Sequence, residues 1–392
     1  MGKIIASGKG RRWLLGGHPW LYLDDVATGL GEPGELVPVD GPNQEPLGWG
    51  LFSTHSRIAV RMVTRSPEQP NREFWASRMR RAVERRRRSG LLDPESGSRL
   101  VSGDADGFPG LVIDRYAQTA VVQCGTQSAD RMRDFILELL QEALPFELTT
   151  IVDRSDASVR KLEGLLPRFE VIKGALAGPV VVRDGTLSYT VDIVEGHKTG
   201  HYLDQAQNRK LAAALAVGGR VLDCFAYDGL FGLHAAAAGA EDVLCLEQNR
   251  AACERILENA QRNGLGGKVR VERVDCMKDL RARAERQERY ELVVLDPPAF
   301  ARSKKEVEGA ERGYVELNRR GLELIPPGGY LVSASCSHNV RPADFMGFIA
   351  SAARLAGRDV WLDALTKAGV DHPHLVTLPE TDYLKCAFLS VG

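Results

Sequence analysis

The sequence predicts an α/β protein whose C-terminal part is a doubly wound, mostly parallel sheet. Residues 221–238 read as an apolar strand ending at Asp223, a tight turn containing Gly229 and Gly232, and a helix. A second apolar run, 242–247, also ends on a carboxylate. Because open α/β sheets bind ligands at the carboxyl ends of their strands, these two units predict a ligand pocket there.

The side chains of this pocket indicate a ligand that carries a ribose and a cation. Glu247, at the end of the second strand, is placed to bind both ribose hydroxyls, whereas Asp223 suits an amino group better than a phosphate. Phe225 and Tyr227 stand in the turn, which lacks the G-x-G-x-x-G spacing of a dinucleotide site, so a nicotinamide oxidoreductase is disfavoured. S-adenosylmethionine fits these features, and a strand–turn–helix unit without a ligand is the alternative.

Composition narrows the class of protein. The chain has 392 residues, is 44% hydrophobic and 26% charged, and so predicts two or three globular domains. Its net charge of −1 argues neither for nor against nucleic acid. Seven cysteines without C-x-x-C spacing favour reduced thiols and a cytoplasmic protein, and no apolar run suggests a membrane span. The segment 371–374 holds two histidines without further ligands, so we expect no metal.

Residues 1–71 predict a small β domain, with short strands at 36–39, 46–52 and 58–63 separated by turns. Basic residues precede Trp13, Trp20 and Tyr22. This combination is typical of RNA contacts, in which charge holds phosphates and rings stack on bases. The same three aromatic residues could equally form the core of the small domain, and the sequence leaves both interpretations open.

Residues 72–185 predict a small mixed α+β domain. Its helix 73–88 has an apolar face and many arginines, which form either a solvated surface or phosphate contacts. The remaining elements expected here are a hairpin at 111–124, a helix at 129–143, a strand at 150–153 and a hairpin at 181–189.

Residues 186–392 contain the expected catalytic sheet and its substrate contacts. Strand 269–275 ends on Asp275, which could accept a hydrogen bond from an adenine amine. Strand 290–296 ends on Asp296, and the following prolines make a stiff acceptor loop suited to an amino group on a flat base. The side chains expected to contact the substrate are Lys198, Arg209, Pro297, Pro298, Phe300 and Lys304.

The strand 329–335 leads directly into Cys336, at the same edge of the sheet as Asp296. A lone cysteine is usually a buried apolar residue, but a thiol at this edge is a candidate nucleophile. The segment 383–389 predicts an edge strand that closes the sheet.

Several motifs together carry a resemblance to a known family. They are KTGHYLDQ at 198–205, DCFAYDG at 223–229, DPPAF at 296–300, SCS at 335–337, GDADGFPG at 103–110 and DRSDASVRKLEG at 153–164. Over nearly its full length the chain resembles the bacterial class I S-adenosylmethionine-dependent 23S rRNA methyltransferases that form 5-methylcytosine. Unlike many RNA cytosine-5 methyltransferases, it has no cysteine at 296–300.

The resemblance implies a β-barrel-like PUA domain, a small middle domain and a Rossmann-like methyltransferase domain. It also implies that Gln205, Glu247 and Asp275 line the cofactor site, that 23S rRNA or a large-subunit precursor is the partner, and that homodimers form. Cys336 would then attack C6 of cytosine while Asp296 holds or protonates N3. The alternatives are methylation of a base nitrogen, such as guanine N7 or an exocyclic amine, and an RNA-binding ribosome assembly factor.

Overall fold

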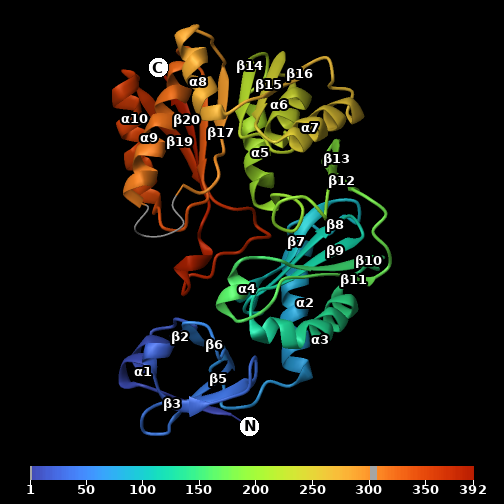
Figure 1. Ribbon diagram of the computed structural model, residues 1–392, viewed down its shortest axis with the longest axis vertical. Coiled ribbons are helices and arrows are strands. Elements are labelled where there is room, and N and C mark those ends of the chain that lie inside the picture. Colours follow the sequence, from blue (N-terminus) through green and yellow to red (C-terminus); the bar gives the residue numbers. More distant parts are fainter. Residues whose placement is uncertain (1, 301–306) are drawn as a thin grey trace. The chain divides into compact units, whose positions relative to one another are not determined.

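The structure is a computed structural model that describes residues 2–300 and 307–392 (Figure 1). It divides the chain into two compact units. The first unit comprises Met1–Val182, Val191–Leu203 and Val370–Thr381. The second comprises Arg183–Thr190, Asp204–Gly369 and Asp382–Gly392.

A six-stranded sheet forms the N-terminal part of the first unit. Its strands, in spatial order, are β2 (Trp20–Tyr22), β6 (Ile58–Thr64), β5 (Pro46–Phe52), β4 (Leu36–Asp40), β1 (Lys3–Ala6) and β3 (Val26–Leu30), and helix α1 spans Gly8–Leu15. The three strands expected from the sequence are confirmed. Trp13 is 46% exposed, and Trp20 and Tyr22 are half-buried beside the aliphatic core, so these aromatic residues do not form the core of this sheet.

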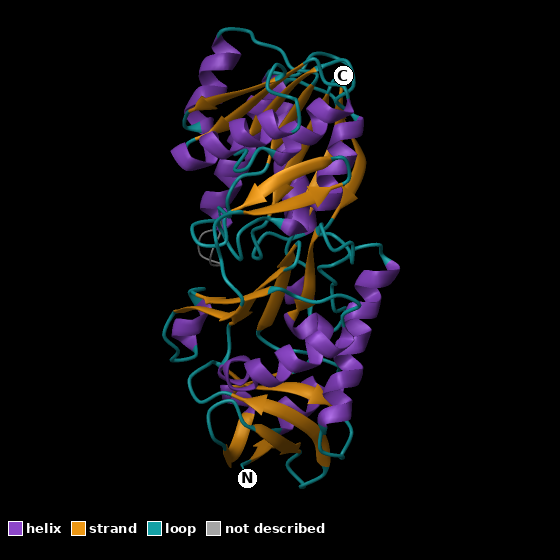
Figure 2. Cartoon of the chain, turned by 90° about the vertical axis from the view of Figure 1, so that its right-hand side faces the viewer, coloured by secondary structure: helices purple, strands orange, loops and turns teal. Residues whose placement is uncertain are grey.

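A five-stranded sheet forms the middle of the chain. Its strands, in spatial order, are β11 (Arg168–Lys173), β10 (Thr150–Ser155), β9 (Thr119–Cys124), β8 (Leu111–Tyr116) and β7 (Gly97–Ser102). Its helices are α2 (Arg72–Arg88), α3 (Gln127–Ala143) and the short α4 (Val159–Leu162), with a 3₁₀ turn η2 at Gly103–Asp106. The expected 111–124 hairpin, both longer helices and the strand at 150–153 are confirmed, and Figure 2 draws these strands in orange and the helices in purple.

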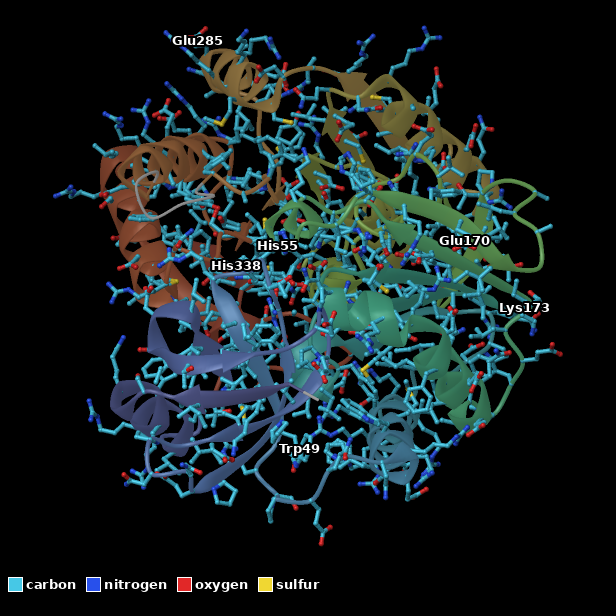
Figure 3. The ribbon with its side chains drawn as sticks, turned by 60° about the horizontal axis from the view of Figure 1, so that its bottom comes forward. Trp49, His55, Glu170, Lys173, Glu285 and His338 are labelled. Carbon is cyan, nitrogen blue, oxygen red and sulfur yellow. The ribbon has the colours of Figure 1, made fainter. Side chains whose placement is uncertain are left out.

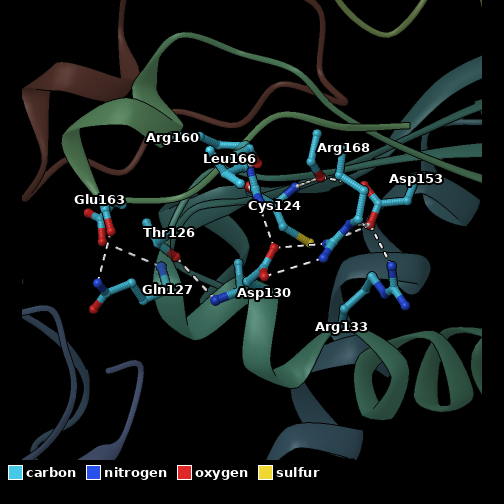
Figure 4. A network of polar contacts seen from close by, with 12 residues as sticks. Cys124, Thr126, Gln127, Asp130, Arg133, Asp153, Arg160, Glu163, Leu166 and Arg168 are labelled. Carbon is cyan, nitrogen blue, oxygen red and sulfur yellow. Dashed lines mark hydrogen bonds and ion pairs between the residues drawn. The ribbon is translucent and has the colours of Figure 1, made fainter. Parts of the chain in front are cut away.

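Hydrogen bonds from arginines to carboxylates link the strands and helices of this middle part of the chain. Asp153, on β10, is fully buried and accepts hydrogen bonds from Arg133 Nη1 and Arg168 Nε, each at 2.7 Å (Figure 4). Asp130, on α3, accepts from Arg160 Nη1 at 2.7 Å and Arg168 Nη2 at 2.8 Å. Residues of the 153–164 motif therefore take part in hydrogen bonds that link β10, α3, α4 and β11.

A seven-stranded sheet forms the second unit. Its strands, in spatial order, are β16 (Val269–Arg273), β15 (Asp242–Glu247), β14 (Arg220–Cys224), β17 (Leu292–Leu295), β18 (Tyr330–Ser335), β20 (Lys385–Val391) and β19 (Val360–Thr366). The first five are parallel, as expected, and β20 runs antiparallel to both of its neighbours. The prediction that the last strand lies at the edge is wrong, because β19 is the edge and β20 lies inside it. A buried, apolar run from Cys386 to Leu389 is what an interior strand requires.

Helices cover this sheet, and a short hairpin accompanies it. They are α5 (Ala206–Ala214), α6 (Leu230–Ala238), α7 (Arg250–Arg262), α8 (Cys276–Glu285), α9 (Val307–Glu323) and α10 (Pro342–Ala356), and the hairpin is β12 (Val180–Asp184) with β13 (Leu187–Val191). The main core packs Tyr314, Phe345 and Ile349 against the sheet. In the described part of the chain, every helix is too short or too polar to cross a bilayer.

Candidate active site

The turn between β14 and α6 is held in a conformation that most side chains avoid. Phe225 and Tyr227 have φ values of 60° and 51°, and Gly229 follows with 74°. The backbone N–H of Phe225 points to Cys276 Sγ at 3.3 Å, and that of Tyr227 donates to Glu247 Oε2 at 2.9 Å. These bonds fix a strained turn at the sheet's carboxyl edge, where strain of this kind is often tied to function.

Asp223 is the most strongly perturbed carboxyl group of the site. It ends β14, is 1% exposed, and accepts the backbone N–H of Gly232 at 2.9 Å. Burial, which has the largest effect, and the charges of Asp296 and Glu247 together raise its pKa to about 7, against the opposing effect of that hydrogen bond. A carboxylate that is costly to ionise in this position is stabilised when a cation binds beside it.

Glu247 ends β15, and Asp275 lies just after β16, the next strand of the sheet. Glu247 is half-buried and accepts two backbone N–H groups, from Tyr227 and, at 2.8 Å through Oε1, from Asn249. Asp275 is exposed and caps α8, because its Oδ1 accepts the N–H of Met277 at 3.0 Å. Glu247 is thus oriented by the turn itself, and Asp275 by the helix that follows it.

Gln205 and Asp296 come from distant parts of the chain and meet in the structure. Gln205 Nε2 donates to Asp296 Oδ1 at 3.0 Å, and Asn208 Nδ2 donates to Gln205 Oε1 at 2.6 Å. Gln205 is 3% exposed, whereas Asp296 is half-buried. The 198–205 and 296–300 motifs therefore meet through a carboxylate whose orientation is fixed by a buried amide.

The residues after Asp296 differ in their surroundings. Pro297 is buried and Pro298 is exposed. The ring of Phe300 lies 4.8 Å from that of Tyr314, and a Cβ at Gly313 would come within 3.0 Å of it. Phe300 thus packs against α9. The next expected contact, Lys304, lies outside the described residues.

Cys336 follows β18 at the same edge of the sheet. β18 is the parallel neighbour of β17, with Leu295 opposite Ser333, so the segments carrying Asp296 and Cys336 leave adjacent strands. Cys336 is partly exposed between two fully buried serines. The hydroxyl of Tyr314 bonds to Ser335 Oγ at 2.8 Å and Ser337 Oγ at 3.0 Å, which fixes the backbone on both sides of the thiol.

The other six cysteines, which are Cys124, Cys224, Cys245, Cys253, Cys276 and Cys386, are all buried. Burial raises the pKa of each of their thiols, to about 12 for Cys124 and Cys276. A thiol of this kind is a poor nucleophile. Cys336 is therefore the cysteine whose exposure allows it to meet a substrate.

A buried lysine that the sequence analysis missed lies beneath Cys336. Lys385 is 3% exposed and pairs across the sheet with Ser335. Its Nζ donates to the carbonyl of Ser337 at 2.7 Å and to that of Tyr383 at 2.8 Å. Burial lowers its pKa to about 8, and the interaction with a charged Cys336 opposes that shift, so the two groups lie within electrostatic reach of each other.

His338 lies farther along the same loop. It is labelled in Figure 3 and is exposed. Its ring lies 5.3 Å from that of Tyr383. The His338 side chain therefore lies at the surface of the loop, beside Tyr383.

The two remaining expected substrate contacts lie in different units. Arg209, on α5, is 3% exposed, and its charge lowers the pKa of Asp223 and of Asp184. Lys198 belongs to the first unit, has a φ of 55°, and places its Nζ 4.4 Å from the centre of the Tyr202 ring. Arg209 thus acts on the cofactor side of its sheet, and Lys198 is ordered by a neighbouring aromatic residue.

The geometry fits S-adenosylmethionine. The ligand's ammonium and sulfonium suit the carboxylates of this site, where the charges of Asp296 and Glu247 raise the pKa of Asp223. A Cβ at Gly232 would lie 2.8 Å from Cys245 Sγ and 3.3 Å from Asp223 Oδ2, so glycine keeps the turn close to the strand. In the described ranges, no group of three or more His, Cys, Asp or Glu side chains could hold a metal ion.

Comparison with known proteins agrees with this geometry. The model of an S-adenosylmethionine-dependent methyltransferase family matches residues 171–367, and that of a PUA-like domain matches 4–65. A protein of Aeromonas hydrophila named "Ribosomal RNA large subunit methyltransferase I" is 38% identical, over 98% of each chain. A protein of Shewanella denitrificans with the same name is 37% identical, over 94% of each chain.

Solved structures share the fold. A methyltransferase solved as a complex with SAH has a TM-score of 0.85 at 20% identity, covering 99% of this chain and 100% of that one. The S-adenosylmethionine-dependent methyltransferase of Agrobacterium tumefaciens has a TM-score of 0.53 at 19% identity, covering 74% and 88%. The chain therefore belongs to the S-adenosylmethionine-dependent methyltransferase family, with S-adenosylmethionine as its cofactor and a PUA-like domain at its N-terminus.

Proposed function

We propose that this methyltransferase forms 5-methylcytosine in 23S rRNA, through a covalent bond between Cys336 and the base. The names of the relatives, which are similar over almost the whole chain, support a large-subunit rRNA substrate. The observation that carries the choice of cytosine C5 is a partly exposed thiol at the edge of the sheet, next to the strand that ends at Asp296.

Cytosine C5 is a weak nucleophile, so the enzyme must first activate the ring. In the proposed reaction, Cys336 Sγ forms a bond to C6, and Asp296 holds or delivers a proton at N3, so that negative charge does not accumulate on the ring. C5 then has the electron density of an enamine carbon. After C5 has been methylated, a base removes the C5 proton, the S–C6 bond breaks, and the thiolate is released.

Lys385 supplies the positive charge that this thiolate needs. Its ammonium is held by two backbone carbonyls under the loop that carries Cys336. Its hydrogen bonds go to those neutral groups, and its charge, which also interacts with Asp382, can act on a thiolate. In this mechanism Lys385 is a positioning residue, since it acts through Cys336.

The cofactor-binding residues orient the methyl donor toward this carbon. Asp223 attracts the ammonium, Glu247 takes the ribose hydroxyls, and Gln205 orients Asp296. Asp275 accepts from the adenine amine, and Phe225, Tyr227 and Gly229 shape the turn. When bound, S-adenosylmethionine supplies an electrophilic methyl group. The target base must be unpaired or flipped out of a helix to reach the site.

The test is nucleoside mass spectrometry. Unmethylated large-subunit rRNA is incubated with the enzyme and S-adenosylmethionine and then digested to nucleosides. We expect 5-methylcytidine as the product. A product methylated on a ring nitrogen or an exocyclic amine would contradict the assignment to C5 and leave Cys336 without a role. Cofactor binding without any methylated nucleoside would instead favour an RNA-binding assembly factor.

A further inference from the structure

A cavity of about 310 Å³ lies within the first unit, away from the methyltransferase sheet. The loop at Gly17 and Pro19, the end of β6, helix α2 and the turn η2 line it, together with Thr377. Four arginines, Arg65, Arg78, Arg81 and Arg85, contribute to its wall. This concentration of positive charge stands in a chain whose net charge is −1.

Arg78 is a half-buried cation without an acidic partner in the part of the chain that the structure describes. Its guanidinium donates to the carbonyls of Val63 and Gly107, the latter at 2.8 Å, and lies 4.3 Å from the centre of the Phe74 ring. Its Nε has no hydrogen-bond partner among the described residues. Burial and, to a smaller extent, the nearby charge of Arg81 together lower the pKa of Arg78 to about 10.

Arg65 and Arg81, which also line the wall, likewise lack a carboxylate among the ion pairs of the described residues. Arg65 Nη2 donates to the carbonyl of Gly17 at 2.7 Å, and Arg81 is exposed. Arg85 of the wall differs, because it pairs with Asp106, as does Arg86 of the same helix. Arg65, Arg78 and Arg81 are therefore the arginines of the wall that have no ion pair among the described residues.

The acidic residues of the cavity do little to neutralise it. Asp106 is already shared by two arginines. Asp104 is half-buried, desolvation raises its pKa, and its carboxylate accepts the indole N–H of Trp20 at 2.8 Å. A half-buried guanidinium held near a like charge without a counter-ion is costly, unless an anion completes the site.

We propose that this arginine cavity, formed by Arg65, Arg78 and Arg81, binds a backbone phosphate of the RNA substrate. Guanidinium groups match the geometry of phosphate oxygens, and two of the three are fixed in place by backbone carbonyls. The identity of the ligand as RNA rests on the proposed function.

Aromatic side chains beside the cavity favour RNA over a free anion. His18 stands between the lining residues Gly17 and Pro19, and its ring lies 4.6 Å from that of Trp13. Trp13 is 46% exposed. An exposed indole next to a phosphate site can stack on a neighbouring unpaired base.

The test measures how RNA affinity depends on salt. Fluorescence anisotropy with a labelled single-stranded RNA of about 16 nucleotides is recorded over a range of salt concentrations. Each lost phosphate contact flattens the slope of log K against log salt by about 0.7 for single strands. We expect this flattening and a several-fold loss of affinity for Arg81→Ala, which removes an exposed side chain and should leave the thermal unfolding temperature unchanged. Arg80→Ala is the matched control, because Arg80 adjoins Arg81 but pairs with Glu73.

The outcomes separate this site from the proposed function. RNA binding with the same slope in Arg81→Ala and wild type overturns the phosphate site but leaves the rRNA substrate standing. Failure of the wild-type protein to bind RNA at all overturns both. In a calorimetric titration with inorganic phosphate, binding that depends on Arg81, while the RNA slope does not, would assign the cavity to a free anion and overturn the proposal.

Discussion

The Asp223 carboxyl group is costly to ionise unless a cation binds beside it. It is buried, it faces the charges of Asp296 and Glu247, and its pKa is about 7 against an ordinary 3.8. A raised pKa in the folded protein means that the protonated form is favoured below that value. Binding of an ammonium group requires the carboxylate, so it must displace a proton when the pH is low.

We therefore predict that affinity for S-adenosylmethionine falls as the pH drops below about 7. The loss approaches tenfold per pH unit and levels off above about pH 8. Calorimetry in buffers of different ionisation enthalpy measures both the affinity and the proton released. Asp223→Asn should bind weakly with little pH dependence. An equally steep pH dependence in that variant would show that another group titrates.

A second prediction at the scale of single residues concerns Lys385. Lys385→Met keeps the length of the side chain but removes the charge beneath Cys336, so the thiolate should form less readily. We expect the pH of half-maximal alkylation of Cys336 by iodoacetamide to rise by roughly one unit. Mass spectrometry identifies the labelled residue, and the buried thiols should react slowly. Lys367→Met is the control, because that lysine pairs with Asp382 near the surface. An unchanged alkylation profile in Lys385→Met would exclude the electrostatic role.

Among the elements, the β14–turn–α6 unit combines tight packing with backbone strain. Apolar residues before Asp223 and glycines after it were sufficient to predict this unit from the sequence, because strand and turn each have a local signature. Helix α1 was not predicted, since its eight residues include two glycines and three cationic side chains. The edge strand β19 was also missed: its side chains are mostly half-buried or exposed, so it lacks the apolar run of its neighbours.

Gly232→Ala tests the packing of this unit. The new Cβ would lie 2.8 Å from Cys245 Sγ and 2.9 Å from Val243 Cγ1, both in the sheet core. We expect a loss of about 1–3 kcal/mol in the free energy of unfolding, together with weaker cofactor binding because the Asp223 carboxylate is displaced. Gly347→Ala, in α10, meets no atom within 4 Å and should instead stabilise the protein by up to about 1 kcal/mol. Denaturant titration of both variants measures the difference. Equal stability of the two variants would contradict this account.

At the scale of the whole molecule, the candidate site is assembled from segments far apart in the sequence. Strand ends carrying acids predicted the cofactor side, because parallel strands bring their carboxyl ends to one edge. The family resemblance places Gln205, in the 198–205 motif, at the cofactor site. Its hydrogen bond to Asp296 can be seen only in the folded structure. Lys385 could not be predicted, because its strand was expected at the edge of the sheet, whereas β20 lies directly beside β18. Likewise, only the fold shows which arginines of the cavity wall have an ion pair, as Arg85 has with Asp106.

Trapping of the covalent intermediate tests the central claim most directly. RNA containing 5-fluorocytidine is incubated with the protein and S-adenosylmethionine, and the products are separated on a denaturing gel. Fluorine at C5 cannot be removed as a proton, so an adduct between a cysteine sulfur and C6 should persist. We predict a protein–RNA band for the wild type and for Cys253→Ser, and none for Cys336→Ala, which should still bind the cofactor. A band of wild-type intensity in Cys336→Ala would contradict the assignment of this thiol as the nucleophile.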